Sequence, residues 1–360
     1  MKIVTIIGAR PQFIKAAMGC KALRKYHKEI LVHTGQHFDD NMSKVFFDEL
    51  GIPEPNYNLG IAGGSHAEMT GKMMMSIEKV LVEERPEALL VYGDTNSTLA
   101  GSLAASKLHI PIFHVEAGNR LGELYNPEEI NRIVADHLSE LKFAATDIAY
   151  NNLVKENIGK GSYVVGNIMY DAFQEYTNKD YRVDKLLSIH NQYIEIPKDY
   201  YYMTCHREEN TRDDNPLTEI LSAMNDLDAK TIYPVHPRNR ERAERICKKM
   251  NYDNIVLVNP VGYVESVNLT KNAKKIVTDS GGLQCEAFFA KVQCVTIYDK
   301  VCWPETMVDN RNQLSKANKK EILEKLSNKQ IIDSSYMPFG DGHAAEKIVK
   351  YINDWEKKND

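Results

Sequence analysis

Short apolar, β-branched runs alternate with longer amphipathic stretches through the first half of the chain. The predicted strands are residues 2–7, 29–34, 88–92, 111–115 and 141–144. The predicted helices between them are residues 11–26, 97–108 and 127–138. Strands that alternate with helices favour a parallel sheet covered by helices, so this half predicts an α/β domain.

A second alternation follows a polar, weakly periodic stretch at residues 178–199, which we interpret as a crossover between domains. Its predicted strands are residues 201–204, 231–233, 255–258, 275–278 and 294–297. We expect the last predicted helix, residues 344–357, to pack back on the first domain. The prediction is therefore two Rossmann-like domains, residues 1–172 with 344–360 and residues 173–343, which face each other across a cleft.

Composition excludes several classes of protein. The 45 Lys and Arg residues against 50 Asp and Glu leave a net charge of -5, which offers no basic surface for nucleic acid. The apolar runs are far shorter than the roughly 20 residues of a membrane helix. The start, MKIVTIIGARPQ, enters a Gly-Ala-Arg-Pro turn after a short apolar run, unlike a secretory signal. We therefore expect a cytoplasmic protein without membrane or nucleic-acid partners.

The sequence also lacks the patterns of common cofactor sites. Its six cysteines are scattered without a Cys-x-x-Cys pair, and its histidines show no His-Glu-x-x-His spacing. This argues against a disulfide framework and a metal site. No G-x-G-x-x-G follows the first strand and no G-x-x-x-x-G-K-[ST] occurs, so we expect no tightly bound NAD and no Walker A loop.

The segment TDSGGLQCEA predicts a phosphate-binding turn. A strand ends before Ser280, and Gly281 and Gly282 open a helix, where free backbone N–H groups and the helix dipole favour an anion. Glu286, one turn into that helix, is placed to accept hydrogen bonds from ribose hydroxyls. The alternative is an ordinary glycine-rich helix start.

Three carboxylates follow predicted strands or open a predicted helix: Asp94 in YGDTNS, Glu116 in HVEAGNR and Glu128 in NPEEINR. Such positions converge on the cleft of this architecture, where burial and charge adapt carboxylates to acid-base work. Asp94 and Glu128 are equally explained as helix N-terminal carboxylates that satisfy free N–H groups.

Basic side chains also follow predicted strands, as two of the three carboxylates do. Arg10 and Lys15 follow the first strand; the alternative for both is a solvated helix face. His206 and Arg207 end one strand of the second domain and His236 ends the next. A lone histidine is more often structural, but two at neighbouring strand ends beside an arginine indicate a diphosphate site.

Nine motifs together resemble those of the non-hydrolysing UDP-N-acetylglucosamine 2-epimerases. They are GARPQFIK, TGQHFDDNM, YGDTNSTLAG, HVEAGNR, PEEINR, TCHREEN, VHPRNR, TDSGGLQCEA and PFGDGHA. They span nearly the whole chain in family order. The resemblance implies a two-domain fold of the glycosyltransferase B type, a homodimer, a UDP-sugar substrate and no redox cofactor.

The resemblance also implies a mechanism, elimination of UDP to a 2-acetamidoglucal followed by protonation from the opposite face and return of UDP. By motif position, Asp94, Glu116 and Glu128 match the catalytic carboxylates. The groups that match contacts to the diphosphate are Arg10, Lys15 and His206, and those that match the UDP cradle are Ser280, Gly281, Gly282 and Glu286. Arg207 and His236 are further substrate-binding candidates from their places at strand ends. His206 is placed with the catalytic groups as well.

Departures from the family pattern leave the sugar open. Tyr298 and Trp303 stand where arginines are expected, and the loop at residues 121–126 is short. The expected reaction is conversion of UDP-N-acetylglucosamine to UDP-N-acetylmannosamine for surface polysaccharide synthesis. The first alternative is a modified sugar such as UDP-2,3-diacetamido-2,3-dideoxy-glucuronic acid. Alternatives from other classes are a glycosyltransferase of the same fold and a non-catalytic nucleotide-sugar binder.

Overall fold

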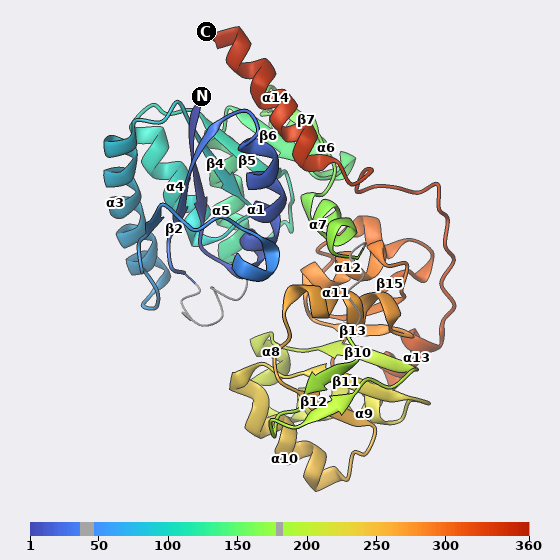
Figure 1. Ribbon diagram of the computed structural model, residues 1–360. Helices are drawn as coiled ribbons and strands as arrows, with labels where there is room; N and C mark the ends of the chain where they lie inside the picture. The colour runs from blue at the N-terminus through green and yellow to red at the C-terminus, as the bar shows by residue number, and fades with distance from the viewer. Residues whose placement is uncertain (37–46, 178–182, 360) are drawn as a thin grey trace. The chain divides into compact units, whose positions relative to one another are not determined.

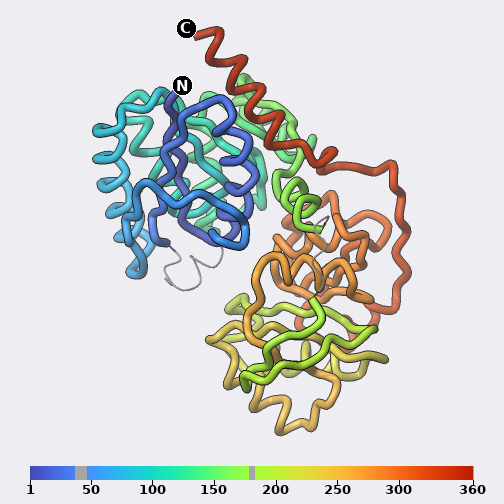
Figure 2. Tube along the Cα trace, in the orientation of Figure 1, coloured from blue at the N-terminus to red at the C-terminus, as the bar shows by residue number. Residues whose placement is uncertain are grey.

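The structure is a computed structural model that describes residues 1–36, 47–177 and 183–359 (Figures 1 and 2). The chain divides into two compact units, Met1–Gln174 with Met337–Asp360 and Glu175–Tyr336. The sequence prediction placed these limits at residues 172 and 344. Residues just before the last helix already pair with the first unit, since Phe339 O accepts a hydrogen bond of 2.9 Å from Asn167 N.

The first unit is built on a seven-stranded sheet in the order β3-β2-β1-β4-β5-β6-β7, and all of its strand pairs are parallel. Its strands are β1 (Lys2–Ile7), β2 (Lys28–His33), β3 (Tyr57–Asn58), β4 (Ala88–Tyr92), β5 (Ile112–Ala117), β6 (Leu141–Ala144) and β7 (Ser162–Val164). The sheet grows outward in opposite directions from β1 and β4. Ligands of such sheets bind beyond the carboxyl ends of the strands at this switch point.

Helices cover this sheet, which explains why its central strands are apolar throughout. The helices that start in the first unit are α1 (Arg10–Leu23), α3 (His66–Glu84), α4 (Asn96–Lys107), α5 (Pro127–Leu138), α6 (Asp147–Lys155), α7 (Ile168–Thr177) and α14 (Ala344–Asn359). Val4, Ile6, Leu89 and Val91 form the core under α3 and α4. The predicted strands and helices of this half are therefore confirmed.

The last helix packs on the first unit, as the sequence predicted. Its Trp355 ring meets Phe113 of β5 edge-on at 5.2 Å between centroids, and Tyr351 stacks on Tyr163 of β7 at 3.9 Å. The drawing shows α14 running beside β7 and α6 (Figure 1).

The second unit contains a six-stranded sheet in the order β12-β11-β10-β13-β14-β15, again with parallel pairs. Its strands are β10 (Tyr200–Thr204), β11 (Lys230–Pro234), β12 (Ile255–Val258), β13 (Ile276–Thr278), β14 (Cys294–Ile297) and β15 (Asn312–Ser315). Its helices are α8 (Glu208–Thr211), α9 (Asp214–Asn225), α10 (Arg240–Met250), α11 (Tyr263–Asn272), α12 (Gly281–Phe289) and α13 (Lys319–Ser327), with short 3-10 turns η1 (Pro237–Asn239) and η2 (Pro304–Asn310). The switch point here lies between β10 and β13.

The interpretation of residues 178–199 as a crossover missed an antiparallel ribbon of β8 (Lys185–Leu187) and β9 (Tyr193–Glu195). Leu186 packs into the second core beside Tyr200 and Tyr202, and this packing supports a ribbon too short to show periodicity in the sequence. Residues 178–182 lie outside the described residues. The predicted α/β class with two Rossmann-like sheets is confirmed. No helix in the described ranges is long and apolar enough to cross a membrane.

Candidate active site

The turn between β1 and α1 is tied directly to the neighbouring strand. A Cβ atom added to Gly8 would lie 2.1 Å from Thr34 Oγ1 and 2.2 Å from Ser97 Oγ, so these two side chains leave no room for one at this position. Gln12 Oε1 accepts hydrogen bonds from Gly8 N at 2.8 Å and Ala9 N at 3.1 Å, and its Nε2 donates to Tyr92 O at 2.8 Å. Gln12 therefore fixes the start of α1 against the end of β4.

Lys15 and Glu116 form a buried ion pair at this edge of the sheet. Lys15 Nζ lies 2.7 Å from Glu116 Oε1, and the side chains are 6% and 10% exposed. The solvated helix face is therefore wrong for Lys15. Glu116 has a φ of 72° beside a register shift in β5, a left-handed conformation that is rare for glutamate and concentrated at functional sites. Its second oxygen, Oε2, is buried without a hydrogen-bond partner among the described residues.

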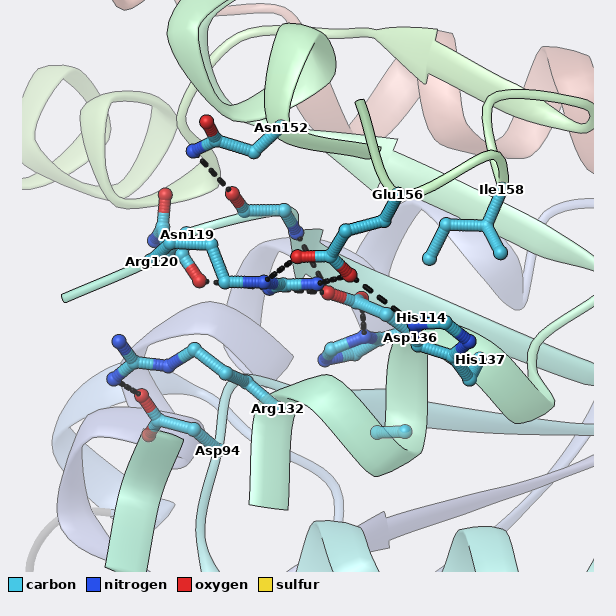
Figure 3. Close-up of polar contacts among 12 residues, drawn as sticks. Asp94, His114, Asn119, Arg120, Arg132, Asp136, His137, Asn152, Glu156 and Ile158 are labelled. Atoms are coloured by element: carbon cyan, nitrogen blue, oxygen red, sulfur yellow. Dashed lines mark hydrogen bonds and ion pairs between the residues drawn. The ribbon is translucent and has the colours of Figure 1, made fainter. Parts of the chain in front are cut away.

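Asp94 follows β4 and pairs with a residue that the sequence analysis did not select. Its Oδ2 accepts a hydrogen bond from Nη2 of Arg132 (Figure 3). Arg132 Nη1 donates to Glu129 Oε2 at 2.9 Å. Burial acts to lower the pKa of Arg132, but Asp94 and Glu129 raise it above its usual value. The missed signal is the spacing in PEEINR, which places Arg132 four residues after Glu128 on α5.

The helix-cap alternatives have different outcomes for the two carboxylates. Thr95 caps α4 by accepting from Thr98 N, so Asp94 is not the capping residue. In α5, Asn126 accepts from the first N–H groups, and Glu128 stands in the first turn with an exposed side chain. Glu128 makes no side-chain hydrogen bond or ion pair with any described residue, so it satisfies no free N–H group, and its place in the first turn favours only an interaction with the helix dipole.

In the second unit, His206 and Arg207 follow β10 and are held by Asp279 at the end of β13. Asp279 Oδ2 accepts from the backbone N–H groups of both residues at 2.8 Å, and its Oδ1 lies 3.0 Å from His206 Nδ1. The Arg207 guanidinium stacks on the Tyr298 ring at 3.8 Å. The His206 ring itself is 47% exposed, so its outer nitrogen, Nε2, is open to a ligand.

The glycine-rich segment opens α12 as predicted. Ser280 is its N-cap and accepts from Leu283 N at 3.4 Å. A Cβ atom added to Gly281 would lie 3.8 Å from Trp303 Nε1, so the indole borders this helix start. Gly282 is half-buried and Glu286 is 5% exposed. The segment offers the free N–H groups that a phosphate needs.

Two further predicted residues stand at the start of a helical segment, one in each unit. Arg10 is the first residue of α1 and is half-buried. His236 is exposed at the start of η1, where its Nδ1 accepts from Arg238 N, and Arg238 Nη2 reaches His206 O at 3.3 Å. Residues 37–42 of the TGQHFDDNM motif lie outside the described residues.

No group of three or more His, Cys, Asp or Glu side chains within the described ranges is arranged to hold a metal ion. Cys20, Cys205 and Cys294 are buried thiols. Burial raises the pKa of the Cys20, Cys205 and Cys294 thiols, which keeps them protonated and unreactive.

Comparison with known proteins identifies the family that shares this arrangement. The family model for UDP-N-acetylglucosamine 2-epimerase matches residues 21–353. The chain belongs to this family. It is therefore an epimerase, and the predicted resemblance is confirmed.

Individual relatives match along the whole chain. A UDP-N-acetylglucosamine 2-epimerase homolog of Methanococcus maripaludis is 48% identical, with 98% of this chain and 99% of the relative covered. The UDP-2,3-diacetamido-2,3-dideoxy-D-glucuronate 2-epimerase of Pseudomonas aeruginosa is 43% identical over the same shares. The solved UDP-GlcNAc 2-epimerase of Methanocaldococcus jannaschii, in complex with UDP-GlcNAc and UDP, has a TM-score of 0.85 at 38% identity and covers 98% of this chain and 100% of its own.

Proposed function

We propose that this epimerase inverts carbon 2 of a UDP-linked 2-acetamido sugar and converts UDP-N-acetylglucosamine to UDP-N-acetylmannosamine. The reaction uses no metal and no redox cofactor. The enzyme acts in the cytoplasm as a homodimer, and its product serves surface polysaccharide synthesis. Family membership favours this function over a glycosyltransferase or a nucleotide-sugar binder.

The observation that carries the proposal is the pairing of two carboxylates with two buried cations at one edge of the first sheet. Glu116 meets Lys15, and Asp94 meets Arg132. Carboxylates held in this way are oriented for proton transfer, and the cations stabilise negative charge that develops on a substrate. A protein that only binds the nucleotide has no use for paired acid-base groups.

The chemistry follows from the substrate. The proton on carbon 2 has no adjacent carbonyl to acidify it, so its removal is coupled to loss of UDP from carbon 1. The C–H and C–O bonds break, a double bond forms between carbons 1 and 2, and a carboxylate takes the proton. A proton then adds to carbon 2 from the other face, and the UDP oxygen returns to carbon 1. Asp94, Glu116 and Glu128 are the proposed proton carriers.

The residues proposed to bind UDP lie mainly in the second unit. His206 and Arg207 offer donors at the carboxyl end of β10, and the start of α12 offers backbone N–H groups beside Ser280. A departed diphosphate must stay bound until it re-adds, and charge-assisted hydrogen bonds from these groups serve that purpose. Glu286 is the proposed acceptor for the ribose hydroxyls, with Arg10 and His236 as further contacts.

Epimerisation in deuterium oxide is expected to place deuterium on carbon 2 of the product, because elimination exchanges that proton with solvent. Mass spectrometry of the purified product measures the label. The control is substrate kept in deuterium oxide without enzyme. Product without label contradicts the elimination route, and conversion that requires an acceptor contradicts the epimerase itself.

A second substrate is favoured by the surroundings of α12. Tyr298 lies under Arg207, and the Trp303 indole, 8% exposed, borders Gly281. An indole offers a flat apolar face and one donor where a guanidinium offers five donors, so a sugar with an extra acetamido group or with less exposed charge fits better. The relative that acts on UDP-2,3-diacetamido-2,3-dideoxy-D-glucuronate, at 43% identity, supports the same candidate.

Rates on the two UDP-sugars, measured side by side, distinguish these substrates. A specialised pocket predicts a preference of about tenfold or more for the diacetamido-glucuronate, equivalent to roughly 1.4 kcal/mol. Trp303→Arg is expected to shift the ratio toward UDP-N-acetylglucosamine, while Trp355→Phe, in α14, is the control. A tenfold preference of the wild type for UDP-N-acetylglucosamine excludes the specialised pocket and leaves the main proposal standing.

A further inference from the structure

His114 lies in the middle of β5 with no exposed surface, and both of its ring nitrogens have a hydrogen-bond partner. Figure 3 shows it beside Asp136. Its Nδ1 is 2.7 Å from Asp136 Oδ1, and its Nε2 is 2.7 Å from Gly93 O. A carbonyl oxygen can only accept a hydrogen bond, so the Nε2 nitrogen must donate to Gly93. The ring therefore connects α5, which carries Asp136, to the residue just before Asp94.

The Gly93 carbonyl belongs to the peptide group that joins Gly93 to Asp94. Gly93 has a φ of 61°, and a Cβ atom added to it would lie 3.3 Å from Lys15 Nζ and 3.9 Å from Glu116 Oε1. The turn thus touches the buried ion pair on one side and carries Asp94 on the other. A hydrogen bond to this carbonyl sets the plane of the peptide, and with it the direction in which the Asp94 side chain leaves the backbone.

Asp136 also fixes the backbone that follows Glu116 at the end of β5. Its Oδ2 accepts from Gly118 N at 3.0 Å, two residues after Glu116, and from Arg120 Nη1 at 2.7 Å. Arg120 in turn makes a two-pronged contact with Glu156, the C-cap residue of α6, at 2.6 and 2.8 Å. Burial acts to raise the pKa of Asp136, but His114 and Arg120 lower it below its usual value, so the carboxylate stays ionised.

We propose that His114, held by Asp136, is a positioning residue for the acid-base carboxylates and acts on Asp94 through the Gly93 carbonyl. This inference rests on the proposed function in one respect, the role of Asp94 in proton transfer. A group misplaced by about 1 Å can lose on the order of 100-fold in rate, so a clamp on the backbone that carries Asp94 has a direct kinetic effect. A buried pair that only stabilised the fold would lower stability without a specific loss at Asp94.

A double-mutant cycle of His114→Phe with Asp94→Asn tests the inference. Phenylalanine keeps a ring of similar size and removes both hydrogen bonds. In the wild-type background we expect kcat to fall by about 30-fold with little change in KM, because the clamp orients the reacting group. In the Asp94→Asn background the same change is expected to cost less than about threefold, because residues that act through one another are not additive.

Asp136→Asn is the conservative variant. Its amide nitrogen donates to His114 Nδ1, His114 Nε2–H still donates to Gly93 O, and its amide oxygen accepts from Gly118 N and Arg120. Geometry is kept while the charge is lost, so we expect kcat within about threefold of the wild type, the range of a preserved clamp. His27→Phe is the matched control, since His27 is buried at the opposite edge of the same sheet beside the amino terminus.

UDP binding, measured by calorimetry, and thermal unfolding accompany every variant. Should His114→Phe not fold, His114→Gln takes its place in the cycle. An equal loss from His114→Phe in both backgrounds, or unchanged kcat, overturns the inference while the epimerase activity of the wild type stands. An Asp94→Asn enzyme with the wild-type rate would instead contradict the proposed role of Asp94, and the two failures are thus distinguishable.

Discussion

Asp94→Asn and Glu116→Gln are each expected to lower turnover by about 100-fold or more, the usual scale for loss of an acid-base group. Each substitution keeps the shape of the side chain and removes its ability to exchange a proton. Lys15 would then face an amide in place of its buried partner at 2.7 Å. Affinity for UDP is expected to stay near the wild-type value, because neither carboxylate is a proposed UDP contact and most of the proposed contacts lie in the second unit. Steady-state rates and calorimetric UDP titration measure both effects.

Glu128→Gln belongs to the same experiment and tests its two interpretations. A loss of about 100-fold supports acid-base work, while an unchanged rate identifies Glu128 as a helix N-terminal carboxylate. Glu68→Gln is the control, because Glu68 is an exposed carboxylate in the first turn of α3 that pairs with Lys72. Wild-type rates in Asp94→Asn and Glu116→Gln together would contradict the assignment of these carboxylates.

The strand ends could be predicted from the sequence because the central strands are buried on both faces. Such strands appear as unbroken apolar runs, so β4 (Ala88–Tyr92) and β6 (Leu141–Ala144) begin and end where predicted. The residues that follow a strand at a switch point then become site candidates by topology alone. The short strands β8 and β9 were missed, because three residues show no period.

The pairings at the site were beyond sequence reasoning. Lys15 and Glu116 come from distant parts of the chain, and only the left-handed backbone at Glu116 turns its carboxylate toward the lysine. Glutamate has no preference for that conformation, so no residue pattern predicts it. The sequence does not predict the contact of Arg132 with Asp94 either, since it depends on how α5 packs beside β4. The sequence could predict which edge of the sheet carries the candidate groups, but not which cation meets which carboxylate.

Asp279→Ala is expected to destabilise the loop after β10 by about 3 kcal/mol, since two partly buried N–H groups and the buried Asn210 amide lose their acceptor. His206 and Arg207 would lose their anchor, so UDP affinity is expected to fall by about tenfold or more. Hydrogen exchange of the amides in this loop and in β13 measures the stability, and calorimetry measures the binding. Asp214→Asn is the control in the same unit, because Asp214 is exposed and pairs with Arg245 at the surface.

The pH dependence of the Asp279→Ala effect follows from the pKa of Asp279 in the folded protein. Burial acts to raise the pKa of Asp279, but the His206 ring and the backbone N–H groups lower it below its usual value. A carboxyl group whose pKa is lower in the folded than in the unfolded protein stabilises the folded state at pH values above its unfolded pKa, about 3.9. This stabilisation is lost as the pH falls through the folded pKa. The difference in exchange protection between wild type and Asp279→Ala is therefore expected to be full at pH 7 and to shrink below about pH 4. A difference that stays constant into acid would mean that the charge of Asp279 does not hold the loop, and that its packing alone does.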